Sequence, residues 1–291
     1  MGLLHKQSPC KVNLLLNILG KRTDGFHELE TIMQPVNFCD DLVFEHCKKG
    51  IQLICSDKTL PTDSKNLVFR AAESFLAAAE ISSGVEIELL KKIPLAAGLG
   101  GGSGNAATTL LALNELFGQP LSTGKLDELA AALGSDVPFF LQSKPALATG
   151  RGEKIQSLGD FPALRGKAFL LIHPGFGIAT PWAYQNLARF PEALNGRPDR
   201  AQKLVARLQT GDWRATRAEF YNSLEAPALK KFPVLALFQE FLRANGALAA
   251  LMSGSGSTTF AIVENVNAGE SLVDKFKAKF GANAWTAVVP V

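Results

Sequence analysis

Residues 94–108 read PLAAGLGGGSGNAAT, and this glycine-rich stretch decides the predicted fold. It follows a strand-like segment, VEIELL at 85–90, and leads into a run of good helix formers. Glycines allow several backbone N–H groups to turn toward an anion, and the helix that follows presents its positive end to the same charge. The stretch therefore predicts a phosphate-binding loop at the start of a helix.

The alternative interpretation is a flexible glycine turn that only joins the strand to the helix. An exposed helix end favours an anion by only about 0.3–1 kcal/mol, so an array of amides must supply most of the affinity. The commoner phosphate motifs do not fit. A GxGxxG pattern begun at Gly98 meets Ser103, one begun at Gly100 meets Asn105, and no Gly-Lys-Ser/Thr follows. A dinucleotide-binding fold and a P-loop ATPase are thus disfavoured.

Composition places the chain among ordinary globular proteins. Its 291 residues are 47% hydrophobic, which is enough for one large or two ordinary domains. The net charge of +3 creates no global field of the kind that marks a nucleic-acid binder. The sequence lacks both a signal-peptide pattern and a membrane span of roughly 20 apolar residues. We predict a cytoplasmic protein with no nucleic-acid and no membrane partner.

The cysteines all lie in the first fifth of the chain, at Cys10, Cys39, Cys47 and Cys55. This distribution is not typical of a disulfide framework. The spacing of eight residues between three of them allows a metal site as an alternative, but no CxxC pair or HxxxH partner accompanies them. We predict buried free thiols and no dedicated metal ligand.

The first half of the chain alternates strands and helices. β-Branched and aromatic residues predict strands at 42–46, 51–55 and 85–90. Ser64 and Asn66 offer caps for a helix over 67–79. Further helices are predicted from about Gly104 to Gly118 and over LDELAAAL, which Gly134 ends.

The pattern restarts after a boundary near 155–165, which divides the chain into predicted domains at 1–160 and 161–291. No internal repeat is evident, so two packed α+β domains are the expected architecture. The predicted elements of the second half are a strand at 168–173, helices at 199–209, 213–222 and 233–245, a strand at 258–263, a helix near 269–279 and a strand, TAVV, at 286–289.

Three segments together resemble a known superfamily. The loop at 94–108 is similar to the ATP-binding motif of the GHMP kinases, which include galactokinase, homoserine kinase and mevalonate kinase. CKVNLLLNILGKRTDGFHELET at 10–31 and LMSGSGSTTFAI at 251–262 resemble the other two signatures, in the expected order. The resemblance implies an α+β fold with an N-terminal ribosomal-protein-S5-like domain and a C-terminal ferredoxin-like domain.

Other segments resemble one branch of that superfamily over essentially the whole chain. They are the N-terminal segment, LGSDVPFFL at 133–141, HPGFGIATPWAY at 173–184 and MSGSGST at 252–258. This branch phosphorylates 4-diphosphocytidyl-2-C-methyl-D-erythritol with ATP on the bacterial and plastid route to isoprenoids. The resemblance implies direct transfer to the 2-hydroxyl. Alternatives are another GHMP kinase, of mevalonate, homoserine or sugar type, and a non-catalytic nucleotide-binding protein.

The resemblance implies two catalytic residues. Asp136 would take the proton from the attacking hydroxyl, and Lys11 would stabilise the charge that develops on the same oxygen. By themselves these residues have plainer interpretations, because Asp136 could cap a turn before Pro138 and a lysine in a strand is usually solvated. Retention of both residues argues against a non-catalytic protein.

The remaining site residues also follow from the resemblance. Phe26 stands where the family often has tyrosine, which preserves stacking but loses a hydroxyl, and Gly104 replaces the second serine of the commoner GGGSSNAA. Phe26 and Tyr184 could also be ordinary core aromatics, and residues 253–257 a plain hairpin turn. The implied substrate-binding residues are Asn13, Phe26, His27, Thr180, Pro181, Tyr184, Gly254, Ser255 and Gly256. The implied ATP-binding residues are Asn66, Leu67, Lys91, Pro94, Leu95, Ala96, Ala97, Gly98, Leu99, Gly100, Gly101, Gly102, Ser103, Gly104 and Asn105.

The implied ligands are ATP, Mg²⁺ and a cytidine diphosphate linked to methylerythritol. Mg²⁺ is usually held through nucleotide phosphates and water, with Ser103 or Thr108 as possible helpers. We expect a monomer or a weak homodimer.

Overall fold

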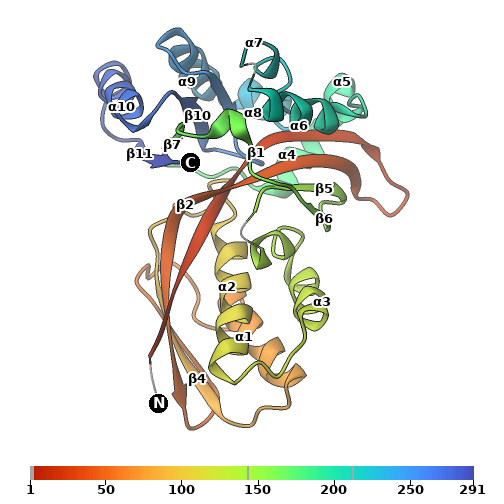
Figure 1. The fold of residues 1–291 in the computed structure, drawn as a ribbon, viewed down its shortest axis with the longest axis vertical. Helices are drawn as coiled ribbons and strands as arrows, with labels where there is room; N and C mark the ends of the chain where they lie inside the picture. The colour runs from red at the N-terminus through yellow and green to blue at the C-terminus, as the bar shows by residue number, and fades with distance from the viewer. Residues whose placement is uncertain (1–2, 143, 212) are drawn as a thin grey trace. The chain divides into compact units, whose positions relative to one another are not determined.

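The chain forms two compact units, each assembled from segments that are separate in the sequence. The computed structural model describes residues 3–142, 144–211 and 213–291 (Figure 1). Unit 1 takes the described residues up to Cys10, Phe38–Pro94 and those from Gly100 to 142; unit 2 takes Lys11–Asn37, Leu95–Leu99 and those from 144 onward. Strands β1 (Leu4–Lys21) and β2 (His27–Cys47) contribute to both units. The two domains predicted from the sequence, 1–160 and 161–291, are continuous in the chain. These interleaved units do not test that boundary, which stays a prediction.

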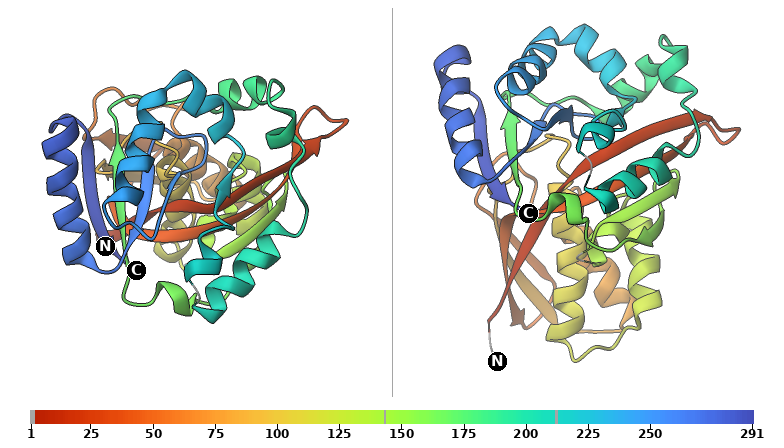
Figure 2. Two further views of the ribbon diagram at one scale, coloured as in Figure 1. Left: turned by 90° about the horizontal axis from the view of Figure 1, so that it is seen from above. Right: turned by 45° about the horizontal axis from the view of Figure 1, so that its top comes forward.

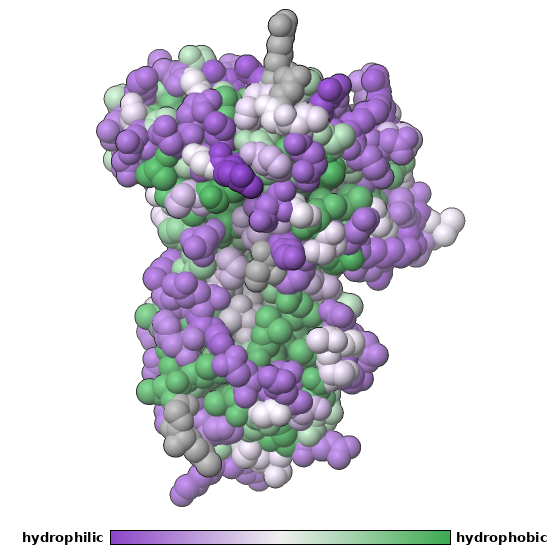
Figure 3. Space-filling view, in the orientation of Figure 1, coloured by the Kyte–Doolittle hydropathy of each residue, from purple (hydrophilic) through white to green (hydrophobic). Residues whose placement is uncertain are grey.

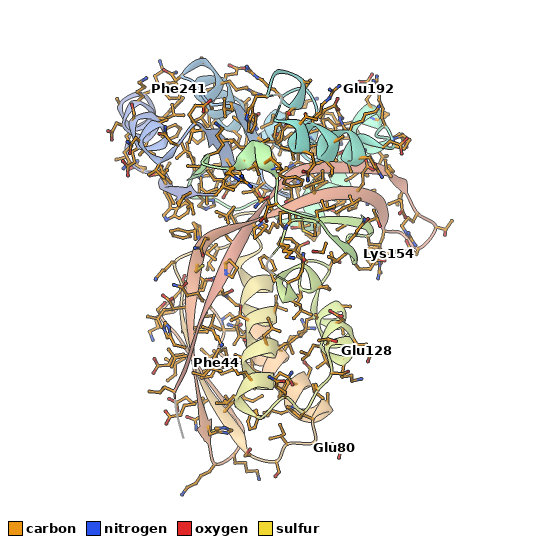
Figure 4. The ribbon with its side chains drawn as sticks, in the orientation of Figure 1. Phe44, Glu80, Glu128, Lys154, Glu192 and Phe241 are labelled. Atoms are coloured by element: carbon orange, nitrogen blue, oxygen red, sulfur yellow. The ribbon has the colours of Figure 1, made fainter. Side chains whose placement is uncertain are left out.

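The sheet of unit 1 contains the three strands predicted for this part of the chain. β3 (Ile51–Cys55) pairs in parallel with β4 (Gly84–Leu90), and β4 pairs antiparallel with the end of β2. Phe44, labelled in Figure 4, lies opposite Ile87 in this ladder, and both side chains are fully buried. The alternation of buried and exposed residues along β3 and β4 gives the sheet one apolar face.

Three α-helices complete the described part of unit 1. They are α1 (Leu67–Ala78), α2 (Gly101–Leu116) and α3 (Thr123–Leu133), and a short 3-10 turn, η1 (Pro138–Leu141), follows them. Asn66 caps α1 by accepting from the N–H of Val68 at 3.0 Å, as predicted. Helix α2 starts at Gly101, so the start predicted at about Gly104 is wrong by three residues.

Close packing explains why α2 begins within the glycines. A Cβ on Gly104 would lie 2.8 Å from the carbonyl oxygen of Pro9 and 3.0 Å from the hydroxyl of Ser8. The helix therefore approaches β1 more closely than any side chain at position 104 allows, and the Ser8 hydroxyl fills the space. Such contacts between distant segments outweigh the low helix propensity of glycine.

Unit 2 contains the predicted ferredoxin-like arrangement. Its sheet has the order β11-β7-β10-β9, and every neighbouring pair is antiparallel. The elements follow one another as strand, helix, two strands, helix and strand, the pattern of that fold. They are β7 (Ala168–His173), α9 (Pro233–Ala244), β9 (Ala249–Met252), β10 (Thr259–Val263), α10 (Val266–Phe280) and β11 (Trp285–Pro290).

Helices α9 and α10 cover one face of this sheet, as the blue helices in Figure 2 show. Leu242 on α9 and Phe276 on α10 pack against alternate residues of β7, such as Leu170. Phe241, labelled in Figure 4, lies partly buried at the edge of the same cluster. Burial of these apolar side chains supplies the main stabilisation of the sheet.

The rest of unit 2 includes one wrong prediction. The helix expected over 213–222 ends at Thr216, and Tyr221–Asn222 instead forms a short parallel strand beside Leu15 and Leu16. Pairing with a remote strand overrode the local helical pattern. The remaining elements are β5 (Ala146–Gly150), β6 (Lys154–Ser157), η2 (Pro162–Leu164), α4 (Thr180–Leu187), α5 (Pro191–Leu194), α6 (Arg200–Thr210), α7 (Trp213–Thr216), β8 (Tyr221–Asn222) and α8 (Glu225–Lys231).

Surface and thiol features complete the description. Apolar residues are interspersed with polar ones on the face drawn in Figure 3, as is normal for folded proteins. Among the described helices, none is both long and apolar enough to cross a membrane. The four cysteines, all among the described residues, are thiols and not disulfide partners. Cys10 and Cys55 are buried, whereas Cys39 and Cys47 are partly exposed, so the prediction of buried thiols is wrong for this second pair.

We predict opposite effects for two glycine-to-alanine substitutions in unit 1. Gly104→Ala should lower the free energy of unfolding by about 1–3 kcal/mol because its methyl group meets backbone. Gly124→Ala, in α3 where an added Cβ meets nothing within 4 Å, should raise it by up to about 1 kcal/mol. Urea titration of both variants measures the difference, and equal effects would contradict the close approach at Gly104.

Candidate active site

The N-terminus of α2 in unit 1 has the form expected of an anion site. Gly100, with φ of 71°, precedes the helix, and as a glycine it has no side chain to cap the first N–H groups. The first bond within the helix runs from the N–H of Gly104 to the carbonyl of Gly100 at 2.8 Å. The amides of residues 101–103 therefore lie in the turn where a helix leaves its N–H groups without intrahelical partners.

A buried carboxylate, which sequence reasoning missed, supports this turn. Asp40 Oδ1 accepts from the backbone N–H groups of Lys92 and Ile93, at 2.7 and 2.9 Å. Its Oδ2 accepts from Asn105 Nδ2 at 2.9 Å and pairs with the ammonium of Lys91. Asp40 is fully buried, and the side chain of Lys91 is 6% exposed.

This network changes the interpretation of two residues predicted to bind ATP. Asn105 directs its amide to Asp40 and to Ser8, and its oxygen accepts from Lys91 Nζ at 3.1 Å. Lys91 Nζ lies 3.4 Å from the position of a Cβ on Gly101, beneath the first turn of α2. Both side chains thus brace the loop from inside unit 1.

The other predicted residues of unit 1 lie at element ends. Asn66 is the cap of α1 and Leu67 is its first residue. Asp136 is half-buried in the turn between α3 and η1, just before Pro138. Pro94 is the last residue of its segment of unit 1, a few residues before α2.

In unit 2, the segment Leu95–Leu99 packs against a second glycine turn at residues 253–257. Gly98 has φ of 76°, and a Cβ there would lie 2.1 Å from the carbonyl oxygen of Ser253, so only glycine fits. Ser253 Oγ donates to the Gly98 carbonyl at 2.9 Å, and the N–H of Thr258 donates to the carbonyl of Ala97 at 3.1 Å. The predicted second turn is thereby joined to half of the phosphate loop.

Lys11 is held beside the same carbonyl. Its Nζ donates to Gly98 O at 3.0 Å and to Asn13 Oδ1 at 2.6 Å, and the residue is 3% exposed. Asn13 Nδ2 in turn donates to Thr31 Oγ1 at 2.9 Å, which fixes its amide with the oxygen toward the lysine. Lys11 is therefore a positioned cation, unlike the solvated lysine that is usual on a strand.

Two of the residues predicted to form the pyrimidine site lie near one another in unit 2. His27 and Tyr184 have ring centroids 5.1 Å apart. Burial, aided by the charge of Lys21, lowers the pKa of His27 and favours its neutral form. Phe26 is 53% exposed and carries the guanidinium of Arg151 4.6 Å from its ring centre, a contact that sequence reasoning missed.

Helix α4 connects this group to the second glycine turn. Thr180, its first residue, shares a hydrogen bond of 3.0 Å with the hydroxyl of Ser255. Pro181 follows at the second position of the helix, and Tyr184 lies one turn further along. The structure thus brings the side chains of Thr180 and Ser255 together within unit 2.

The carboxylate of a half-buried residue, Glu225, lies under the glycine turn. Glu225 Oε1 accepts from the N–H of Met252 and from Gln239 Nε2, both at 2.7 Å. Burial raises the pKa of Glu225 to about 7, although these hydrogen bonds act in the opposite direction. No motif in the sequence indicated this role.

Within the described ranges, no cluster of three His, Cys, Asp or Glu side chains could hold a metal ion.

Comparison with known proteins defines the class. The family model for the GHMP kinases N terminal domain matches residues 66–144, and that for the GHMP kinases C terminal domain matches residues 192–282. Together with the glycine loop on α2 and the ferredoxin-like sheet of unit 2, these matches make the protein a GHMP small-molecule kinase.

Proteins of similar sequence and structure identify the family within this class of kinases. The chain is 45% identical over 260 residues, 89% of each chain, to 4-diphosphocytidyl-2-C-methyl-D-erythritol kinase of Syntrophus aciditrophicus. A crystal structure of 4-(cytidine 5'-diphospho)-2C-methyl-D-erythritol kinase superposes with a TM-score of 0.80 at 34% identity, covering 99% of this chain and 100% of that one. The chain belongs to the 4-diphosphocytidyl-2-C-methyl-D-erythritol kinase family. A homoserine kinase from Cytophaga hutchinsonii, at 23% identity, 100% and 95% coverage and a TM-score of 0.77, shares the fold.

We predict that loss of the buried Asp40 charge is costly. Asp40→Asn removes the negative charge that neutralises the buried ammonium of Lys91, so the free energy of unfolding should fall by about 3–5 kcal/mol. Asp41→Asn is the matched control, because Asp41 pairs with Lys92, whose side chain is 52% exposed, and should cost no more than about 1 kcal/mol. Denaturant titration compares them, and similar losses would contradict the supporting role of Asp40.

We also predict a stability change with pH that comes from Glu225. Because its pKa is raised from 4.5 to about 7, the folded protein binds this proton more tightly than the unfolded chain does. Its stabilising contribution is therefore complete below pH 4.5 and is lost as pH rises through 7, by about 3 kcal/mol. The stability difference between wild type and Glu225→Gln should change by that amount. Glu240→Gln, at an exposed site of α9, is the control, and a constant difference for Glu225→Gln would refute the shift.

Proposed function

We propose that this kinase transfers the γ-phosphoryl group of ATP to the 2-hydroxyl of 4-diphosphocytidyl-2-C-methyl-D-erythritol. The observation that carries the proposal is the positioned ammonium of Lys11, which is buried in unit 2 beside Gly98 and the second glycine turn. The substrate named for the relatives supports the choice of alcohol. The product would be a phosphate ester on the route to isoprenoid precursors.

The proposed nucleotide contacts come from the glycine loop. Amides of residues 101–103 would hold the phosphates at the N-terminus of α2, which the Asp40 network keeps in place. Mg²⁺ would bind chiefly through the nucleotide phosphates, and Ser103, half-buried in the first turn of α2, is the protein hydroxyl best placed to assist. When bound, the ion supplies neutralisation of phosphate charge. Thr108 is a weaker candidate because it is 9% exposed.

The proposed proton transfer uses Asp136. The hydroxyl must lose its proton as it attacks, and a carboxylate positioned as a base accelerates such a step by about 10²–10⁴-fold. Lys11 would stabilise the negative charge that develops on the attacking oxygen. Its contacts with Gly98 and Asn13 direct the ammonium in advance, so little reorganisation is needed during the reaction.

The proposed cytidine site uses the aromatic group of unit 2. A pyrimidine ring is well held against aromatic faces, and neutral His27 can present one donor and one acceptor to the polar edge of the base. Phe26 and Tyr184 would provide the stacking surfaces, with Thr180 and Pro181 at the start of α4 beside them. Arg151, over the Phe26 ring, would have to shift if the base stacks on that face.

The aromatic group also separates the proposed substrate from the alternatives. A mevalonate, homoserine or sugar kinase would use the same phosphate loop but would not need the aromatic group. The cytoplasmic location and the monomer or weak homodimer stay predictions, which fractionation and light scattering would test.

An ADP-release assay tests both the substrate and the base. Wild-type protein with ATP and Mg²⁺ should turn over the cytidine compound in preference to mevalonate, homoserine and galactose. Asp136→Asn should lower kcat by about 10²–10⁴-fold because the base is lost while the shape is kept. The control, Asp127→Asn, changes an exposed aspartate of α3 in the same way and should leave kcat unchanged.

Two results would count against these assignments. Faster turnover of another alcohol would overturn the substrate, and an Asp136→Asn protein as active as Asp127→Asn would overturn the base.

A further inference from the structure

We propose that Asn222 and Glu225 are positioning residues for the second glycine turn, residues 253–257, and through it for Lys11. This inference rests on the proposed function, since it assigns a catalytic consequence to their placement. The two residues belong to the short segment NSLE that links β8 to α8. They are called the clamp below.

The side-chain amide of Asn222 donates two hydrogen bonds that hold the turn. Its Nδ2 donates to the carbonyl of Met252 at 2.8 Å and to that of Gly254 at 2.7 Å. Its Oδ1 accepts from the N–H of Leu224 at 2.9 Å, which fixes the amide orientation. The residue is 2% exposed, so water cannot readily replace these bonds.

Glu225 completes the clamp by binding the other backbone group of Met252. The N–H of Met252 donates to Glu225 Oε1, while the carbonyl of Met252 accepts from Asn222. Both backbone groups of the residue that enters the turn are thus bonded to one segment. Gln239 on α9 donates to the same Glu225 oxygen and ties the clamp to the helical layer of unit 2.

The strand pairing of β8 places the clamp. Asn222 lies opposite Leu16 of β1, the strand on which Lys11 and Asn13 also lie. The N–H of Ser223 donates to the carbonyl of Leu16 at 2.8 Å, and Ser223 Oγ accepts from the N–H of Ile18 at 2.9 Å. The clamp is therefore hydrogen-bonded to β1, the same strand that carries Lys11.

The clamped turn contacts the surroundings of Lys11 directly. A Cβ on Gly254 would lie 3.1 Å from Gly98 O, 3.3 Å from Lys11 Nζ and 3.4 Å from Asn13 Oδ1. The carbonyl that Asn222 holds belongs to this same Gly254. Without the clamp, the turn could shift, and because Gly254 lies in contact with Lys11, the ammonium would shift with it. A displacement of about 1 Å can lower the rate by about 10²-fold.

Asn222→Asp is the test variant because it keeps the shape and the acceptor for Leu224 but removes both donors to the turn. It also sets a carboxylate against two carbonyl oxygens. Asn245→Asp is the matched control. Asn245 ends α9 and donates its Nδ2 to the carbonyl of Phe241 at 2.9 Å, away from the turn.

Two measurements separate positioning from mere stability. Steady-state kinetics on folded protein should show, for Asn222→Asp alone, a kcat lower by about 10- to 10²-fold and a higher KM for the alcohol. The KM for ATP should not change, because its proposed contacts come from the amides of residues 101–103. Hydrogen–deuterium exchange without substrate should become faster in the peptide that covers 253–258.

Variants of Glu225 keep the test valid if Asn222→Asp fails to fold. Glu225→Gln retains an oxygen for the N–H of Met252 and should behave like wild type at pH 6, where Glu225 is mostly neutral, whereas Glu225→Ala should show the kinetic and exchange changes. Equal behaviour of the two Glu225 variants, or of Asn222→Asp and Asn245→Asp, would overturn the clamp.

Failure of the proposed function would look different. If wild type prefers another alcohol, the substrate assignment fails, and the same constants are measured with that alcohol. The exchange experiment needs no substrate, so unchanged exchange in both Asn222→Asp and Glu225→Ala overturns the clamp whatever the substrate is.

Discussion

The carbonyl oxygen of Gly98 accepts hydrogen bonds from Lys11 Nζ and from Ser253 Oγ, and these two bonds hold the candidate site of unit 2 together. The backbone at Gly98 comes so close to Ser253 that a side chain has no room. One peptide therefore joins the first half of the phosphate loop, the second glycine turn and the lysine of β1. A cation held in this way is oriented before any substrate arrives, which is the condition for electrostatic catalysis.

A carboxylate braces the glycine segment in each unit. Asp40 receives two backbone N–H groups and two side-chain donors beneath the N-terminus of α2. Glu225 receives the N–H of Met252 beneath the second turn. Glycine-rich backbone has little stiffness of its own, because glycine loses more conformational freedom on folding than other residues do. Rigid polar contacts to neighbouring segments supply the order that the glycines lack.

The glycines and the side chains around them therefore have different roles. The glycines bring backbone amides close to phosphate, and side chains from other segments fix where those amides lie. Asn105 illustrates the point, since its side chain is directed into the Asp40 network and away from solvent. Gly104 is explained in the same way, because the missing serine would collide with β1, where the hydroxyl of Ser8 lies 3.0 Å from the would-be Cβ.

The sequence by itself determined the local features: the strands at 51–55 and 85–90, the cap at Asn66, the glycine loop before a helix, and the three motifs that indicate a GHMP kinase. Such features depend on residues that are neighbours in the chain. Tertiary structure alone decided that Tyr221–Asn222 forms a strand, that α2 starts at Gly101, and that Asp40 and Glu225 support the two glycine segments. Each of these depends on contacts with residues far away in sequence, whose packing outweighs local propensity and leaves no periodic signal.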